Sequence, residues 1–260
     1  MLKLFVKNKI TSVFQLTYGV FLKVFKKVYN FLTSKPCHIK PISYSKTFNL
    51  DSNTDFSPIS LIQSLNLKVR GVVQVGAHIG QEVESLKLMD KNLHFLVFEP
   101  YENCLKILKD RYLDDPTVKI VGKALGSKKA FGILNLASNE GQSSSLLKPK
   151  EHLVKAPHVT FSGSAKVEID TLDSYESVAN KCNFLIIDTQ GYELEVLKGG
   201  EVVIQSIDYI YIEVNRGEVY VNCSQFKEVN QFLVERGFHC SHIRWWDLWG
   251  DAFYIRINKN

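Results

Sequence analysis

The apolar stretch VVQVGAHIG, from Val72 to Gly80, ends in two glycines that are separated by three residues. A glycine-hinged turn after a buried strand brings backbone amides close to a ligand. A loop that binds a nucleoside triphosphate needs a lysine after its last glycine, but Gln81 and Glu82 stand there. A dinucleotide-binding turn needs a glycine at the position of His78. The turn therefore predicts an uncharged or zwitterionic ligand without phosphates.

An acidic residue closes the next apolar segment, HFLVFEP. Glu99 lies nineteen residues after Gly80, and a carboxylate at this place can accept two hydrogen bonds from the hydroxyls of a ribose. This arrangement suits a nucleoside without phosphates, of which S-adenosylmethionine is the common one. A tight turn without a ligand, beside a solvated glutamate, explains the same residues equally well.

Three further acids stand where they can take a proton from a hydroxyl group. A methyl transfer from S-adenosylmethionine is an in-line displacement, so an enzyme must align an oxygen with the methyl carbon and remove its proton. Asp188 ends the segment FLIID, Glu193 lies just inside the next predicted helix, and Glu213 ends YIYIE. Asp188 also suits a helix cap, and Glu193 the positive end of a helix. Acids at strand ends also bind Mg²⁺, but no tight cluster is evident, and we predict no metal site.

Strand and helix patterns alternate from Asp51 onward, which predicts an α/β fold. In the first half the predicted elements are strands at 72–76, 94–100 and 118–125, an additional strand beside the third at 131–138, and helices at 79–89 and 101–112. Residues 138–166 are polar and rich in turn formers. They predict a long loop, and such loops often serve as lids or binding loops.

The second half continues the pattern and ends in a pair of strands. The predicted elements are strands within 166–175, 184–190, 209–214, 238–245 and 251–257, and helices that begin near Tyr192 and span 224–235. A short turn that contains Gly250 separates the last two strands, so we expect them to pair antiparallel. The chain therefore predicts a mostly parallel sheet that ends in an antiparallel hairpin.

The length and composition predict one domain with an appendage. A chain of 260 residues buries one sizeable core, and its 45% apolar and 23% charged residues are typical of a soluble globular protein. The five cysteines are far apart and include no C-x-x-C pair. This spacing argues against a disulfide framework and a structural zinc site, and indicates a reducing cytoplasm. We expect an arm at residues 1–40 and a domain at 41–260.

The arm is basic and amphipathic. It carries eight lysines and no acid, whereas residues 41–260 hold 24 basic and 27 acidic side chains. Only thirteen residues separate Lys9 from Lys23, too few for a membrane span, and no small-residue cleavage site indicates a signal peptide. A helical wheel places Phe14, Phe21 and Phe25 on one face and Lys23, Lys26 and Lys27 opposite. Such a helix lies on an anionic membrane; packing on the domain or on a second subunit is the alternative.

Several segments together resemble a known family. They are VVQVGAHIGQE, LVFEPYENC, GKALGSKKAFGILNLAS, SSSLL, EIDTLDSY, FLIIDTQGYELEVLKGGE and YIYIEV. In order and spacing they are similar to the FkbM family of S-adenosylmethionine-dependent methyltransferases, over roughly residues 55–255, and DTQGYELEVLKGG (188–200) is the most specific piece. The resemblance implies a Rossmann-like methyltransferase fold, S-adenosylmethionine as cofactor, and O-methylation of a hydroxyl, often on a sugar or another secondary metabolite.

The resemblance also implies site residues. The cofactor-binding positions are Gln74, Gly76, Ala77, His78, Gly80, Glu99, Pro100, Lys123, Ala124 and Asp188, and the catalytic positions are Asp188, Glu193 and Glu213. Two positions depart from the family pattern, because Gln74 stands where many members have Asp and His78 where many have Asn. Gln74 can accept a hydrogen bond from the ammonium of the ligand but supplies no negative charge.

We therefore expect an O-methyltransferase that acts on a hydroxyl of a saccharide, a glycolipid precursor or a related metabolite. Two alternatives stay open: an inactive methyltransferase-like binding module at a membrane surface, and a nicotinamide-dependent oxidoreductase. We expect a cytoplasmic protein that is peripheral on the inner membrane face through residues 1–35. Because the arm has aromatic residues and no arginine, we expect no nucleic-acid partner.

The membrane hypothesis makes a direct prediction. The full-length protein should co-sediment with anionic vesicles, because each lysine near an anionic surface contributes about 1 kcal/mol, and added salt should weaken this binding. A truncated protein that starts at Pro41 should stay in the supernatant and still bind cofactor. Insolubility of the truncated protein, or loss of its cofactor binding, would assign the arm to the core or to a subunit interface.

Overall fold

The computed structural model describes residues 48–49 and 55–257. The predicted arm at 1–40 and its membrane association lie outside these residues and stay predictions. Of the helices within residues 55–257, none combines the length and the apolar character that a membrane crossing requires.

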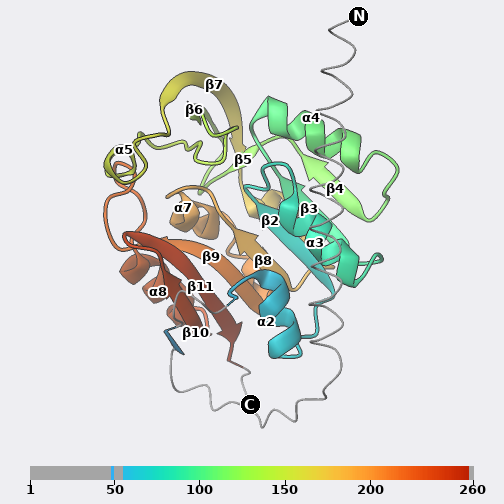
Figure 1. Cartoon of the computed structure of the whole chain (residues 1–260). Coiled ribbons are helices and arrows are strands. Elements are labelled where there is room, and N and C mark those ends of the chain that lie inside the picture. The colour runs from blue at the N-terminus through green and yellow to red at the C-terminus, as the bar shows by residue number, and fades with distance from the viewer. Residues whose placement is uncertain (1–47, 50–54, 258–260) are drawn as a thin grey trace, which may run out of the picture. The chain divides into compact units, whose positions relative to one another are not determined.

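A sheet of eight strands forms the centre of the described chain (Figure 1). Its strands are β1 (Phe48–Asn49), β2 (Gly71–Val75), β3 (His94–Phe98), β4 (Val118–Val121), β8 (Phe184–Ile187), β9 (Tyr209–Asn215), β10 (Phe238–Trp245) and β11 (Trp249–Arg256). Their spatial order is β1-β10-β11-β9-β8-β2-β3-β4. Strands β4, β3, β2, β8 and β9, which are neighbours in this order, run parallel to one another. Strand β11 pairs antiparallel with both β9 and β10. The predicted parallel sheet with an antiparallel hairpin is thereby confirmed.

The chain order of the strands creates a switch point. From β2 the chain moves outward through β3 to β4, and later it returns to place β8 on the other side of β2. The crossovers that leave β2 and β8 therefore turn to opposite directions along the sheet. Ligands in open α/β sheets bind at the carboxyl ends of the strands at such a point.

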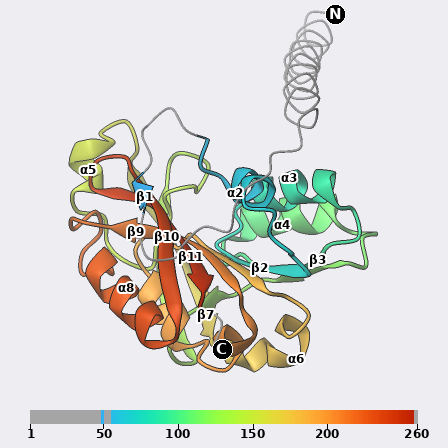
Figure 2. The same cartoon turned by 90° about the horizontal axis from the view of Figure 1, so that it is seen from below.

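Helices cover both faces of the sheet (Figure 2). One face carries α2 (Pro58–Ser64), α3 (Gln81–Met89) and α4 (Glu102–Arg111); the other carries α6 (Glu176–Ala179), α7 (Glu193–Lys198), α8 (Phe226–Glu235) and the 3₁₀ turns η1 (Leu172–Tyr175) and η2 (Val203–Ser206). Because both faces are covered, residues on both sides of the central strands are buried. This explains why β8 is a continuous hydrophobic run and why β2 is apolar except at Gln74, with no alternation of apolar and polar residues.

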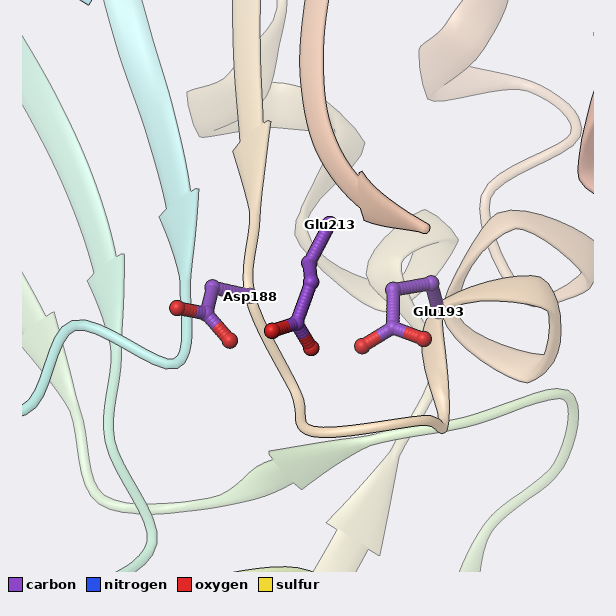
Figure 3. Close-up of side chains that lie close together, drawn as sticks. All are labelled: Asp188, Glu193 and Glu213. Carbon is purple, nitrogen blue, oxygen red and sulfur yellow. The ribbon is translucent and has the colours of Figure 1, made fainter. Parts of the chain in front are cut away.

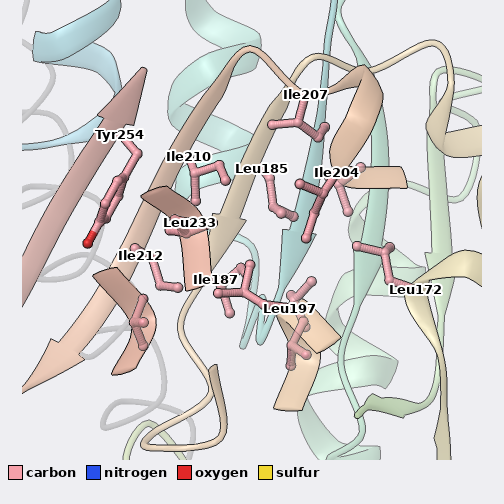
Figure 4. Packing of buried hydrophobic residues seen from close by; sticks show 14 of the residues in the cluster. Leu172, Leu185, Ile187, Leu197, Ile204, Ile207, Ile210, Ile212, Leu233 and Tyr254 are labelled. Carbon is pink, nitrogen blue, oxygen red and sulfur yellow. The ribbon is translucent and has the colours of Figure 1, made fainter. Parts of the chain in front are cut away.

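The larger core lies between the sheet and α7, α8 and η2 (Figure 4). Leu185 and Ile187 from β8 meet Leu197 from α7, and all three are at most 1% exposed. In α8 the apolar residues Val229, Phe232 and Leu233 are spaced by three and four positions, which places them on one buried face. Truncation of a fully buried leucine to alanine costs about 2–5 kcal/mol, so this layer holds the β8–α7 segment in place.

A second, three-stranded sheet differs from the sequence-based expectation. It contains β5 (Ala124–Leu125), β6 (Ala130–Ala137) and β7 (Phe161–Asp170), in the order β5-β7-β6. The predicted strand 118–125 is therefore wrong as one element, because the chain leaves the large sheet after Val121 and joins the small one at Ala124. The additional strand β6 lies beside β7, not beside the third strand.

Two further boundaries need correction. The predicted loop 138–166 ends earlier, because β7 begins at Phe161, and it contains the short helix α5 (His152–Lys155). Gly250 is not in the turn of the last hairpin but within β11, opposite Trp245. A Cβ at Gly250 would lie 2.0 Å from the carbonyl oxygen of Arg244. The glycine is thus needed for close strand approach, a reason that local turn patterns do not reveal.

Gly76 follows β2 directly and contacts the ends of both neighbouring strands, β3 and β8. Its φ is +78°, and its amide donates to the carbonyl of Phe98 at 3.0 Å. The amide of Asp188 donates to the carbonyl of Val75 at 3.0 Å. A Cβ at Gly76 would lie only 1.8 Å from the carbonyl oxygen of Asp188. Glycine is therefore required here by contact with protein backbone, whereas the sequence suggested only the approach of a ligand.

Substitution of Gly76 by alanine should destabilise the fold by moving the end of β8. Gly237→Ala is the matched control, because Gly237 has φ +79° but nothing within 4 Å of the added Cβ. The control should lose about 1–2 kcal/mol from left-handed strain alone, and Gly76→Ala about 2 kcal/mol more. Equilibrium unfolding in denaturant measures both. Equal losses would show that the contact with Asp188 is not what demands glycine.

Candidate functional site

A pocket of about 370 Å³ opens at the carboxyl ends of β2, β3, β8 and β9. The turn after β2 and the residues after β8 lie side by side in its wall, and residues 139–146 of the long loop line another side. The pocket thus lies at the switch point of the strand order, where the topology predicts a ligand.

The turn after β2 presents Gly76, Ala77 and His78 to the pocket. His78 has φ +51°, an uncommon conformation for a residue with a side chain. Its ring Nε2 lies 3.0 Å from the carbonyl oxygen of Glu140 in the long loop. His78 therefore connects the turn to the loop that faces it across the pocket.

Glu99 lines the pocket and binds backbone amides of two segments. One carboxylate oxygen accepts from the amide of His78 at 2.7 Å, and the other accepts from the amide of Tyr101 at 2.7 Å. The side chain is only 6% exposed, and this burial raises the pKa of Glu99 to about 7, against the opposing effect of the two amide bonds. Each oxygen has a second lone pair. Glu99 can therefore hold both turns and still accept a hydroxyl of a ligand.

Asp188 and Glu213 stand side by side at the ends of neighbouring strands (Figure 3). Both line the pocket, and the Nε2 of Gln190 donates to them at 2.7 Å and 3.2 Å. Asp188 itself is exposed to the pocket. The protein atoms around it partly desolvate its carboxylate and raise the pKa of Asp188 to about 6, while the bond from Gln190 opposes the rise. Desolvation, with the charges of Asp188 and Glu193, raises the pKa of Glu213 well above its usual range.

Glu193 has a different environment. It is fully buried, it does not line the pocket, and its Oε1 accepts from the amide of Thr189 at 3.0 Å and the amide of Gly191 at 2.9 Å. The hydroxyl of Thr189 donates to the same oxygen at 3.0 Å. Burial raises the pKa of Glu193 to about 7. These contacts make Glu193 a positioning residue that shapes the segment from Asp188 to Gly191.

One oxygen from each of Asp188, Glu193 and Glu213 lies within 4.8 Å of the others. Figure 3 shows Glu213 between the other two, a closeness that the sequence did not predict. The oxygens of Glu193 already accept from backbone and hydroxyl donors, and the amide of Gln190 links the other two carboxylates. The expectation that no metal binds here stays a prediction.

Most predicted site residues meet at this pocket. Those that line it are Gly76, Ala77, His78, Glu99, Pro100, Lys123, Ala124, Asp188 and Glu213. Gln74 and Gly80 do not line it: Gln74 is 2% exposed beneath the turn, and Gly80 begins α3 in a left-handed conformation. The ammonium N of Lys123 lies 2.9 Å from Glu168 and 3.4 Å from Asp170. These two acids engage its charge, so Lys123 is not an unpaired cation.

Sequence reasoning missed several residues of the pocket, among them Glu82, Gln190, Ser143, His152 and Trp249. Glu82 could have been found as the first-turn acid of the helix that follows the glycine turn. Ser143 lies in the polar loop, and its hydroxyl is 3.0 Å from the Nε2 of His152. No local pattern indicates that pairing, because only the folded loop brings the two together.

Comparison with known protein sequences gives two matches. The family model described as "Methyltransferase FkbM domain" matches residues 74–240. The 2-O-methyltransferase NoeI of Sinorhizobium fredii is 34% identical over 157 residues, which cover 57% of this chain and 65% of that protein. The present chain therefore spans less than two thirds of the length of that relative.

Two solved structures of methyltransferases align with this chain. A methyltransferase FkbM from Methylobacillus flagellatus aligns with a TM-score of 0.49 and 18% identity, over 76% of this chain and 48% of that chain. A SAM-dependent methyltransferase from Aquifex aeolicus aligns with a TM-score of 0.46 and 14% identity, over 78% of this chain and 90% of that chain.

The buried contacts of Glu193 predict a structural effect. Glu193→Ala leaves buried amides without an acceptor and should lower the free energy of unfolding by roughly 3 kcal/mol. Glu193→Gln keeps an oxygen at the Oε1 position and should stay within about 1 kcal/mol of the unmodified protein. Glu195→Gln, on the same helix but partly exposed, is the control for loss of an acid. Denaturant unfolding that shows no loss for Glu193→Ala would contradict this role.

Proposed function

The chain belongs to the FkbM methyltransferase family, and from this premise we propose that it transfers a methyl group from S-adenosylmethionine to a hydroxyl oxygen of a saccharide or a related metabolite. The observation that carries the proposal is the pair of carboxylates, Asp188 and Glu213, at the ends of adjacent strands and open to one pocket. A hydroxyl acceptor needs a group that takes its proton, and this pair supplies candidates at the switch point.

The charge of the pocket supports a cationic donor. Glu82, Glu99, Asp188 and Glu213 all line it. Among residues 55–257, Lys123 is the sole lysine or arginine in the lining, and it is paired with Glu168 and Asp170. A ligand with a sulfonium and an ammonium group suits this field, whereas the pyrophosphate of a nicotinamide dinucleotide would meet repulsion. This disfavours the oxidoreductase alternative.

In the proposed reaction, Asp188, Gln190 and Glu213 have different roles. S-adenosylmethionine, when bound, supplies an electrophilic methyl carbon. Asp188 accepts the proton of the acceptor hydroxyl, and a pKa of about 6 makes its carboxylate form available at neutral pH. Gln190 fixes the orientation of that carboxylate through its 2.7 Å hydrogen bond. Glu213, on the adjacent strand and lining the same pocket, can form a hydrogen bond with the acceptor hydroxyl.

The lining on the loop side suits a polyhydroxylated acceptor. Gln142 in the loop offers an amide group, the amide of Asn139 beside it is hydrogen-bonded to Ser143, and Trp249 at the start of β11 offers an aromatic ring. Amides can bond hydroxyls in either direction, and an aromatic ring gives an apolar face for the carbon atoms of a sugar ring. The relative NoeI is a 2-O-methyltransferase by name, which supports oxygen as the accepting atom.

The direct test uses a labelled methyl donor and a saccharide extract of the source cells. The proposal expects label in saccharides, in a linkage that resists alkali, as an ether does and an ester does not. Calorimetric titration with S-adenosylmethionine, S-adenosylhomocysteine and NAD separates the alternatives. Binding of the sulfur ligands without methyl transfer to any component favours the inactive binding module, and binding of NAD alone favours the oxidoreductase.

Asp188→Asn should reduce methyl transfer by roughly 10²-fold or more while the dissociation constant of S-adenosylhomocysteine changes little. Because the pKa is raised to about 6, the carboxylate predominates above pH 6, and the rate in the unmodified protein should fall as the pH drops through 6. The rate of the Asp188→Asn variant should not show this fall between neutral pH and pH values below 6. Asp90→Asn, at an exposed acid at the far end of α3, is the control. Unchanged transfer in Asp188→Asn would remove Asp188 from the chemistry.

A further inference from the structure

Gln74 is a polar residue in an apolar place. It lies in the middle of β2, is 2% exposed, and its partners in register are Val97 and Ile186. Its Nε2 donates to Glu82 at 2.8 Å, but its Oε1 is buried without a hydrogen-bond partner. A buried unpaired carbonyl costs about 1–3 kcal/mol, and an apolar residue here would avoid that cost. The arrangement therefore calls for a role in which the bond to Glu82 matters.

Glu82, which accepts the hydrogen bond from Gln74, is the more exposed residue of the two. It lies in the first turn of α3, lines the pocket, and is half-buried. Among residues 55–257, no lysine or arginine forms an ion pair with Glu82, so the pocket presents a carboxylate that is oriented but not neutralised.

The charges nearby point to a cationic occupant. The negative charge of Glu82 contributes to the raised pKa of Asp188 and of Asp251, which shows that the three acids interact. Repulsion of this kind destabilises the free pocket and is relieved when a positive group binds. An ammonium group fits better than a sulfonium at Glu82, because an ammonium donates hydrogen bonds and a sulfonium has no proton to donate.

We propose that Glu82, oriented by Gln74, binds the α-ammonium group of the amino-acid portion of the methyl donor. This inference rests on the proposed function. It assigns Glu82 as a binding residue and Gln74 as a positioning residue behind it, so that the negative charge absent at position 74 is supplied eight residues later. Gln74 then affects the ligand through Glu82 and does not contact it directly.

The test compares ligands that share the nucleoside but differ in the amino-acid portion. S-adenosylhomocysteine carries the ammonium, S-adenosylmethionine carries the ammonium and a sulfonium, and 5′-methylthioadenosine carries neither charge. Glu82→Gln should weaken binding of the first two by roughly 10- to 100-fold and leave 5′-methylthioadenosine within about twofold. Gln74→Leu, which suits the apolar neighbours, should give the same selective loss to a smaller extent.

Glu84→Gln is the matched control, because Glu84 lies in the same first turn of α3 but pairs with Arg111; all three ligands should bind it normally. Weaker binding of S-adenosylmethionine alone would move Glu82 to the sulfonium and overturn the proposal. An equal loss for all three ligands in Glu82→Gln, or no loss, would overturn it as well. If the unmodified protein binds none of the three, the proposed function itself fails, a result distinct from the other outcomes.

Discussion

The close packing of Gly76 on the carbonyl group of Asp188 sets the geometry on which the pocket depends. A Cβ at Gly76 would lie 1.8 Å from the carbonyl oxygen of Asp188. The backbones of the turn after β2 and of the end of β8 are therefore in close contact, with no room for a side chain between them. The amide of Asp188 is held by Val75 in the same contact. As a result, the turn after β2, whose amides donate to Phe98 and Glu99, shares one wall of the pocket with the acid that follows β8. Their separation cannot vary without disturbing the central strands.

Buried carboxylates then hold the loops around this junction. Glu99 links the turn after β2 to the start of α4, and Glu193 gathers the amides that follow Asp188. Hydrogen bonds to a charged acceptor contribute about 1.5–3 kcal/mol each, and they satisfy backbone groups that no strand or helix can pair. Burial raises the pKa values of both acids to about 7, while the amide bonds that order the loops oppose this rise.

The small sheet and the long loop complete the site from a distant part of the chain. Inserted between β4 and β8, this segment meets the central turn through the contact of His78 with the carbonyl of Glu140. On its far side the hydroxyl of Tyr220 lies 2.9 Å from the carbonyl of Ser143 and 2.8 Å from the Oε1 of Gln190. The loop is therefore tied to both walls, and the residues proposed to receive the acceptor belong to a connected network.

The sequence alone determined the central strands, the glycine turn and the acids at the strand ends, because strands covered on both faces are continuous apolar runs and their carboxyl ends are marked by polar residues. It did not determine that residues 118–125 divide between two sheets, that Gly250 lies within a strand, or that Glu193 is buried and does not line the pocket. Those outcomes depend on partners far along the chain, as when Ser224 meets the carboxylate of Glu193 across 31 residues. Local patterns record burial and turn formation, whereas the direction and the hydrogen-bond partners of an acid are decided only when distant segments pack together.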